Sequence, residues 1–151
     1  MDASDILTAD EIQLVLANLR KRAKRSVVAW QHLVIFRLAC CCGLRRQEIA
    51  QLTLEDVMCN SQRPIIRIRK EIAKGRVGKK RGRNVPLWWD SGTLADLSEW
   101  REYRKSVGAS LKDPFICVQK GPRKGGWLVI KALSRRWLGV IGVLGKERIR
   151  R

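Results

Sequence analysis

The run Gly43-Leu44-Arg45-Arg46-Gln47-Glu48 sets an arginine and a carboxylate three residues apart, directly after an apolar stretch that ends in glycine. Such an arginine can present its planar guanidinium to a phosphate through two parallel hydrogen bonds, a geometry that the ammonium group of lysine does not offer. Glu48 lies about one helical turn further on and is better placed to orient its surroundings than to react. The candidate chemistry is therefore the binding of a phosphodiester backbone, with Arg45 as the contact.

A segment rich in lysine and arginine follows this box. Residues 63–83 hold ten basic side chains and one acidic one, Glu71. Isoleucine alternates with arginine over 65–69, which predicts a strand with one buried face and one basic face. A loop with three glycines leads to 83–87, which is expected to be the returning strand and to be ended by its proline. The segment therefore predicts a basic β-hairpin, and this concentration of charge indicates a polyanionic partner.

The whole chain is also strongly basic and has the length of one domain. Its 151 residues, 45% of them hydrophobic, are enough for a single core over 1–151. The formal net charge of +18 favours nucleic acid as the partner. The apolar run 33–44 contains Arg37 and is shorter than the ~20 residues that span a bilayer, so no membrane partner is expected. The acidic start of the chain is unlike a signal peptide, and a cytoplasmic protein is expected.

The cysteines and the single histidine are not spaced like a metal site. Residues 40–42 are three consecutive cysteines, and adjacent side chains on a helix point about 100° apart, which does not suit one tetrahedral ion. The odd total of five cysteines is also unlike a disulfide framework. Reduced thiols that serve as small packing groups are expected, with His32 as a helix residue, no metal and no cofactor.

Helical periodicity predicts the elements that position the box and the hairpin. Thr8 and Glu11 form a capping box, and Gly43 is suited to ending a helix. The expected helices are 8–22, 27–42, 45–52, 93–105 and 131–144, with a capped turn at 53–56 and a short strand at 113–118. The predicted fold class is therefore α+β, mainly α-helical, with a small antiparallel β-hairpin or three-stranded sheet.

The order of box and hairpin resembles the tyrosine recombinase (phage integrase) family, whose catalytic domain carries Gly-Leu-Arg-x-x-Glu and then a β-hairpin with an active-site lysine. The matching positions are Gly43, Leu44, Arg45 and Glu48. The resemblance covers about residues 7–151 and implies a partial catalytic-domain fold of that family. The sequence reaches Arg151 before the family's His-x-x-Arg box and tyrosine nucleophile. Strand cleavage by this polypeptide alone is therefore not expected.

The resemblance also implies roles for individual residues. Arg45 would be the first phosphate-binding arginine, with Glu48 in support. Lys74, which precedes Gly75 in the hairpin loop, would be the general acid for the leaving 5′ oxygen, and Lys79 and Lys80 are the alternatives. The expected contacts with the DNA backbone, which position a duplex without reading its sequence, are Arg67, Arg69, Arg76, Lys79, Lys80, Arg81 and Arg83.

The function expected on this basis is DNA binding within integration or site-specific recombination, with double-stranded DNA and an intact recombinase as partners. Two alternatives stay open: a non-catalytic DNA-binding or regulatory module that is a decayed integrase relative, and a basic RNA-binding protein. A helix-turn-helix over 46–56 is disfavoured because Glu55 and Asp56 would stand where bases are contacted. The sole tyrosine, Tyr103, lies on an amphipathic helix and is expected to pack rather than to act as a nucleophile.

The apolar stripe in 131–144 predicts self-association. Leucine, tryptophan, valine and isoleucine recur there at helical spacing, at Leu133, Trp137, Val140, Ile141 and Leu144. In the family that the chain resembles, further helices would cover the same core, so apolar surface is expected to stay open to other copies. Light scattering should therefore give a mass that rises with protein concentration; a constant monomer mass contradicts this expectation.

Overall fold

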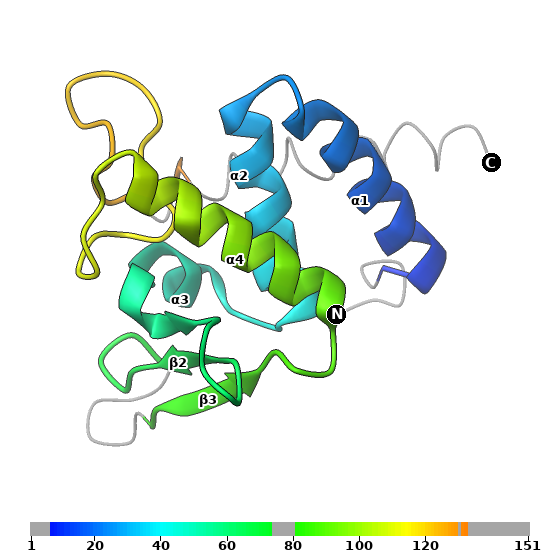
Figure 1. Ribbon diagram of the computed structural model, residues 1–151, viewed down its shortest axis with the longest axis horizontal. Coiled ribbons are helices and arrows are strands. Elements are labelled where there is room, and N and C mark those ends of the chain that lie inside the picture. Colours follow the sequence, from blue (N-terminus) through cyan, green and yellow to red (C-terminus); the bar gives the residue numbers. More distant parts are fainter. Residues whose placement is uncertain (1–6, 74–80, 130, 133–151) are drawn as a thin grey trace.

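The computed structural model describes residues 7–73, 81–129 and 131–132 (Figure 1). Over these residues the protein is mixed α+β, with a small three-stranded antiparallel sheet on one side of a larger helical part. The predictions for Lys74, Arg76, Lys79 and Lys80, and for nearly all of the helix at 131–144, lie outside the described residues. The α+β class with a small sheet is confirmed.

Helix α1 (Ala9–Ala23) begins at the predicted capping box. The Glu11 backbone N–H donates to Thr8 Oγ1 at 3.1 Å, and the Thr8 N–H donates to Glu11 Oε1 at 3.1 Å. Its apolar stripe packs against α2 (Val27–Phe36) in a cluster that includes Leu19 and Phe36, both fully buried. The first two predicted helices are therefore confirmed.

Helix α2 ends in a π-helical turn, η2 (Arg37–Cys41), which periodicity did not predict. The Cys42 N–H donates to the Arg37 carbonyl at 3.0 Å, and the Leu44 N–H donates to the Leu38 carbonyl at 3.0 Å. Gly43 between them has φ +71, a left-handed conformation that glycine adopts without strain. The glycine therefore ends the helix as predicted, and α3 (Arg46–Gln51) begins after only two more residues.

The sheet consists of β1 (Val57–Met58), β2 (Ile65–Ile68) and β3 (Arg83–Pro86), in the order β1-β2-β3 with both pairs antiparallel. The predicted hairpin is β2 with β3. Ile66 lies opposite Val85 and Ile68 lies opposite Arg83, and both isoleucines are buried. The period-two pattern thus identified the buried face, while the edge strand β1, which follows the 3-10 turn η3 (Leu54–Asp56), was not predicted.

The strand predicted at 113–118 is wrong. The segment makes only the isolated bridges Thr53 to Pro114 and Cys117 to Trp127. Its Phe115 N–H donates to the Leu52 carbonyl, and its Cys117 N–H donates to the Gln31 side chain. The backbone groups that a strand would offer to a neighbour are therefore bonded to a loop and to a buried glutamine.

Helix α4 (Ser91–Ser106) crosses the molecule in front of α2 and carries the centre of the core (Figure 1). Trp100 is fully buried and its Nε1 donates to the Phe115 carbonyl at 2.8 Å. Tyr103 packs on Trp30 and Trp100, with ring centroids 4.9 Å and 5.4 Å away. Tyr103 is therefore a packing residue, as predicted. No described helix is both long enough and apolar enough to cross a membrane.

We predict that Ile66→Ala destabilises the protein by about 2–5 kcal/mol, because it removes a fully buried side chain where β2 meets the core. Ile65→Ala is the matched control, since Ile65 precedes Ile66 in the same strand and is only half-buried. Urea unfolding of the two variants measures the difference. Equal losses would mean that the alternation along β2 does not decide which side chain supports the core.

Candidate nucleic-acid interface

Arg45 stands at the first turn of α3 with an exposed side chain. Its backbone is extended, with φ −82 and ψ 158, and its N–H donates to Glu48 Oε1 at 2.9 Å. Within the described part of the chain, the Arg45 guanidinium makes no hydrogen bond or ion pair. The backbone of Arg45 is therefore fixed while its charged group stays open to a ligand.

Glu48 is a fully buried carboxylate that joins α3 to the hairpin. Its oxygens accept two hydrogen bonds from the Arg83 guanidinium, at 2.5 Å from Nη1 and 2.9 Å from Nη2. Burial alone would raise the pKa of Glu48, but the hydrogen bonds from Arg83 and from the Arg45 N–H outweigh it, so the pKa is lowered. The same pairing raises the pKa of Arg83. Glu48 is therefore ionised and links the Arg45 backbone to the Arg83 side chain, while its supporting role at a DNA site stays a prediction.

Asp56 is a second fully buried carboxylate, and it holds two more of the predicted DNA contacts. It accepts hydrogen bonds from the Thr53 N–H at 3.1 Å and the Thr53 hydroxyl at 2.9 Å. Arg67 Nη2 and Arg69 Nε each lie 3.1 Å from its oxygens. The capped turn at 53–56 was predicted from the sequence, but its pairing with the strand arginines was not, because no spacing rule joins the two segments.

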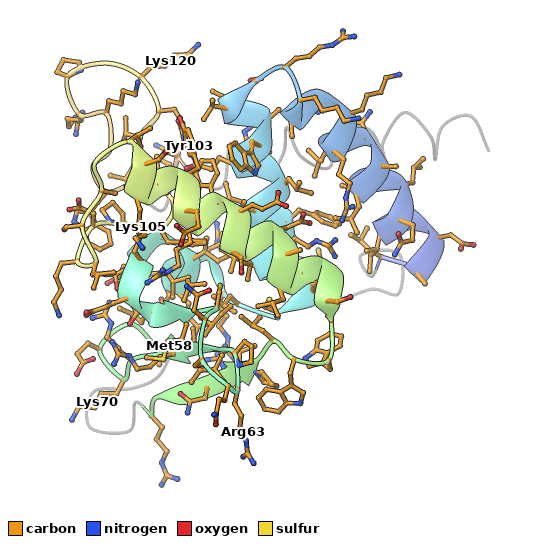
Figure 2. All side chains as sticks on the ribbon, in the orientation of Figure 1. Met58, Arg63, Lys70, Tyr103, Lys105 and Lys120 are labelled. Atoms are coloured by element: carbon orange, nitrogen blue, oxygen red, sulfur yellow. The ribbon has the colours of Figure 1, made fainter. Side chains whose placement is uncertain are left out.

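The surface of the hairpin keeps an excess of positive charge despite these pairs. The side chain of Arg67 is 40% exposed and that of Arg83 is 37% exposed, so both reach solvent beside their carboxylates. Lys70, labelled at the far end of β2 in Figure 2, and Arg81 are exposed. A shallow groove crosses this surface and is lined by four basic side chains, one acidic side chain and three uncharged residues: Arg67, Ile68, Arg69, Lys70, Glu71, Gly82, Arg83 and Asn84. We call these residues the hairpin surface.

Gly82 fits this groove because there is no space for a side chain. A Cβ atom at this position would lie 2.8 Å from the Ile68 carbonyl oxygen. The close approach of the two strands therefore requires glycine there. Arg83 is the next residue in the chain, and its guanidinium reaches Glu48 on α3.

Two of the three consecutive cysteines have thiols that burial makes unreactive. Burial, helped by the neighbouring Cys41, raises the pKa of Cys40 to about 11 and that of Cys42 to about 12. Both thiols are therefore protonated at neutral pH and are poor nucleophiles and metal ligands. The three consecutive cysteines are half-buried rather than buried. In 7–73, 81–129 and 131–132, no three metal-ligating side chains lie together as a site.

The arrangement suits the binding of a phosphate backbone. The exposed Arg45 guanidinium stands at the start of α3, beside the cationic hairpin. The buried Glu48 carboxylate accepts hydrogen bonds from the Arg45 backbone N–H and from the Arg83 side chain. In comparisons with known proteins, no protein-family model and no curated protein matches the chain.

We predict that Glu48→Gln lowers the free energy of unfolding by about 1.5–3 kcal/mol at neutral pH, because charged hydrogen bonds to a buried carboxylate are lost. Since the folded pKa of Glu48 lies below its ordinary value of 4.5, this contribution is complete above that pH and is lost as the pH falls through the folded pKa. Wild type and variant should therefore converge in acid. Unfolding in denaturant at several pH values measures this.

The matched control is Glu71→Gln, which removes an exposed carboxylate close to the end of β2. It should change the stability by no more than about 0.5 kcal/mol. A gap between wild type and Glu48→Gln that stays constant down to strong acid would contradict an ionised Glu48.

Proposed function

We propose that this chain is the DNA-binding part of a tyrosine recombinase or integrase, acts in the cytoplasm in DNA integration or site-specific recombination, and does not cut DNA by itself. The observation that carries the proposal is the link made by Glu48. It bonds the Arg45 backbone and the Arg83 side chain, so the Gly-Leu-Arg-x-x-Glu box and the basic hairpin form one unit. The proposed function requires that the box and the hairpin lie side by side, because both would contact the same DNA backbone.

Electrostatics supports a duplex rather than a small anion as the ligand. The exposed cationic groups are spread over the start of α3 and the hairpin, at Arg45, Lys70 and Arg81. Regularly spaced phosphates can neutralise such a series one after another and release counterions at each contact. The affinity should therefore fall steeply with salt and depend little on sequence.

Within this proposal, Arg45 binds the phosphate at which a strand would be exchanged, and Lys74 is the general acid for the leaving 5′ oxygen, with Lys79 and Lys80 as alternatives. Transfer of a DNA strand also needs a nucleophile. The single tyrosine of this sequence, Tyr103, is packed between Trp30 and Trp100. A nucleophile from an intact recombinase partner would complete the reaction.

A second candidate function, a non-catalytic DNA-binding or regulatory module, is favoured by the arginine pairing. Arg67, Arg69 and Arg83 are each tied to a buried carboxylate, which makes them part of the scaffold as well as of the surface. A hairpin held in this way can occupy DNA without any reactive group. The two functions differ in whether an intact recombinase is helped or blocked when this chain is added.

We predict that Arg45→Ala weakens binding to double-stranded DNA about 5- to 100-fold and leaves the stability within about 0.5 kcal/mol, since no described contact of its side chain is lost. The slope of log affinity against log salt should become shallower by about 0.9 per lost phosphate contact. Arg45→Lys should restore only part of the affinity, because lysine cannot bind in two-pronged fashion. Anisotropy titrations of a labelled duplex measure all three quantities.

Lys105→Ala is the control, since it removes one exposed positive charge at the end of α4. Equal effects of the two substitutions would reduce the role of Arg45 to net charge. Addition of the protein to a nicked suicide duplex should give no covalent product, and such a product would refute the proposed lack of cleavage. Competition by RNA of equal length that exceeds competition by DNA would favour the RNA-binding alternative.

A further inference from the structure

The turn that joins β3 to α4 carries two exposed tryptophans. The Asp90 N–H donates to the Leu87 carbonyl at 3.4 Å, so Trp88 and Trp89 occupy the two central positions of the turn. Their exposed fractions are 58% and 62%. Leu87 at the base of the turn is buried, and its N–H donates to the Pro64 carbonyl at 2.9 Å. The turn is therefore anchored while both indoles project from it.

Packing in the core does not explain the position of either indole, since both are largely exposed. The central positions of turns favour glycine, proline, asparagine, aspartate and serine, because these residues suit the backbone geometry. The core has its own tryptophans, Trp30 and Trp100, which pack edge to face. In the part of the chain that the structure describes, Trp88 and Trp89 contact no other aromatic ring. Two neighbouring indoles left in water indicate a binding surface.

Trp89 is already oriented for stacking. Its Nε1 donates to the Pro86 carbonyl at 2.9 Å, which satisfies the only polar group of the indole. The ring therefore needs no hydrogen bond from a ligand, and it loses less conformational freedom on binding. What remains open is its aromatic face, which suits a flat partner.

The charges around the turn favour an anionic ligand. Arg63 precedes Pro64 and Trp88 follows Leu87, so the hydrogen bond between Leu87 and Pro64 places the backbones of Arg63 and Trp88 close together. The Arg63 side chain is exposed beneath the sheet (Figure 2). Arg63 forms no ion pair within the described residues. Asp90 is the acidic neighbour, but its carboxylate accepts hydrogen bonds from the Thr93 N–H and hydroxyl and interacts with the buried Arg37. The available charge beside the indoles is therefore positive.

We propose that Trp88 and Trp89 form a stacking site for an unpaired nucleobase, with Arg63 as the contact for the adjoining phosphate. The proposal rests on the proposed function in that the ligand is nucleic acid, and it adds a preference for DNA with a single-stranded end or gap. Every base has an aromatic face, so the site is tolerant of sequence. The turn directly follows β3, so a strand leaving the duplex on the hairpin surface can reach it.

The test compares one labelled duplex that is blunt with the same duplex carrying a short single-stranded overhang, both titrated with the full chain. Wild type should bind the overhang form more tightly. Trp88→Ala and Trp89→Ala should each weaken that form about 5- to 100-fold, in line with the loss of one base stack, and change blunt-duplex binding by less than about twofold. Arg63→Gln should weaken the overhang form and reduce its salt dependence.

Trp127→Ala is the matched control, because Trp127 is 51% exposed and lies on a different loop. The proposal is overturned if Trp127→Ala has the same effect, or if the turn variants weaken both DNA forms equally. It is also overturned if the turn variants change self-association in light scattering and leave DNA binding intact, since the indoles would then be a protein contact. Wild type that binds neither DNA form would instead refute the proposed function on which this inference rests.

Discussion

The buried Glu48 carboxylate is the constraint on which the rest of the interface depends. Removal of a charge from water is unfavourable unless it is fully paired, and Glu48 achieves this with two bonds from Arg83 and one from the Arg45 N–H. The partners come from α3 and β3, so the carboxylate is stable only when the hairpin is seated on the helical part. Loss of either partner would leave a buried charge with too few hydrogen bonds. Asp56 is paired in a similar way with Arg67 on β2 and with Arg69 directly after that strand.

This pairing divides the positive charge of the protein into two kinds. Arginines bonded to a buried carboxylate fix the position of the strands, and their charge is partly neutralised from within. Arg45 is held through its backbone N–H, and its exposed guanidinium makes no hydrogen bond or ion pair within the described residues. The formal net charge of +18 is therefore a poor measure of the hairpin surface. It counts arginines whose charge is partly neutralised by buried carboxylates, and it says nothing of where the charges are held. It is this positioning, rather than the total charge, that supports a phosphate-binding role.

Much of the fold could be predicted because its signals are local. The capping box at Thr8, the glycine at position 43 and the alternation along β2 each depend on neighbours in the chain, and each appears as expected. The π turn at Arg37–Cys41 and the irregular course of 113–118 could not be predicted. In the first, the buried Arg37 bonds Asp96 and Thr93 on α4; in the second, Gln31 binds the Cys117 backbone. Both depend on groups far away in sequence.

The sequence by itself determined the main helices, the buried face of the hairpin and the identity of the candidate phosphate contact, because periodicity, capping and residue chemistry act over a few neighbouring residues. Only the tertiary structure decided which of the described hairpin arginines pair with a buried carboxylate. Glu48 and Arg83 are 35 positions apart, and their pairing exists because the fold brings the Arg83 guanidinium on β3 to the buried carboxylate on α3. Burial and distance set the strength of a charge pair, and neither quantity is present in the order of the residues.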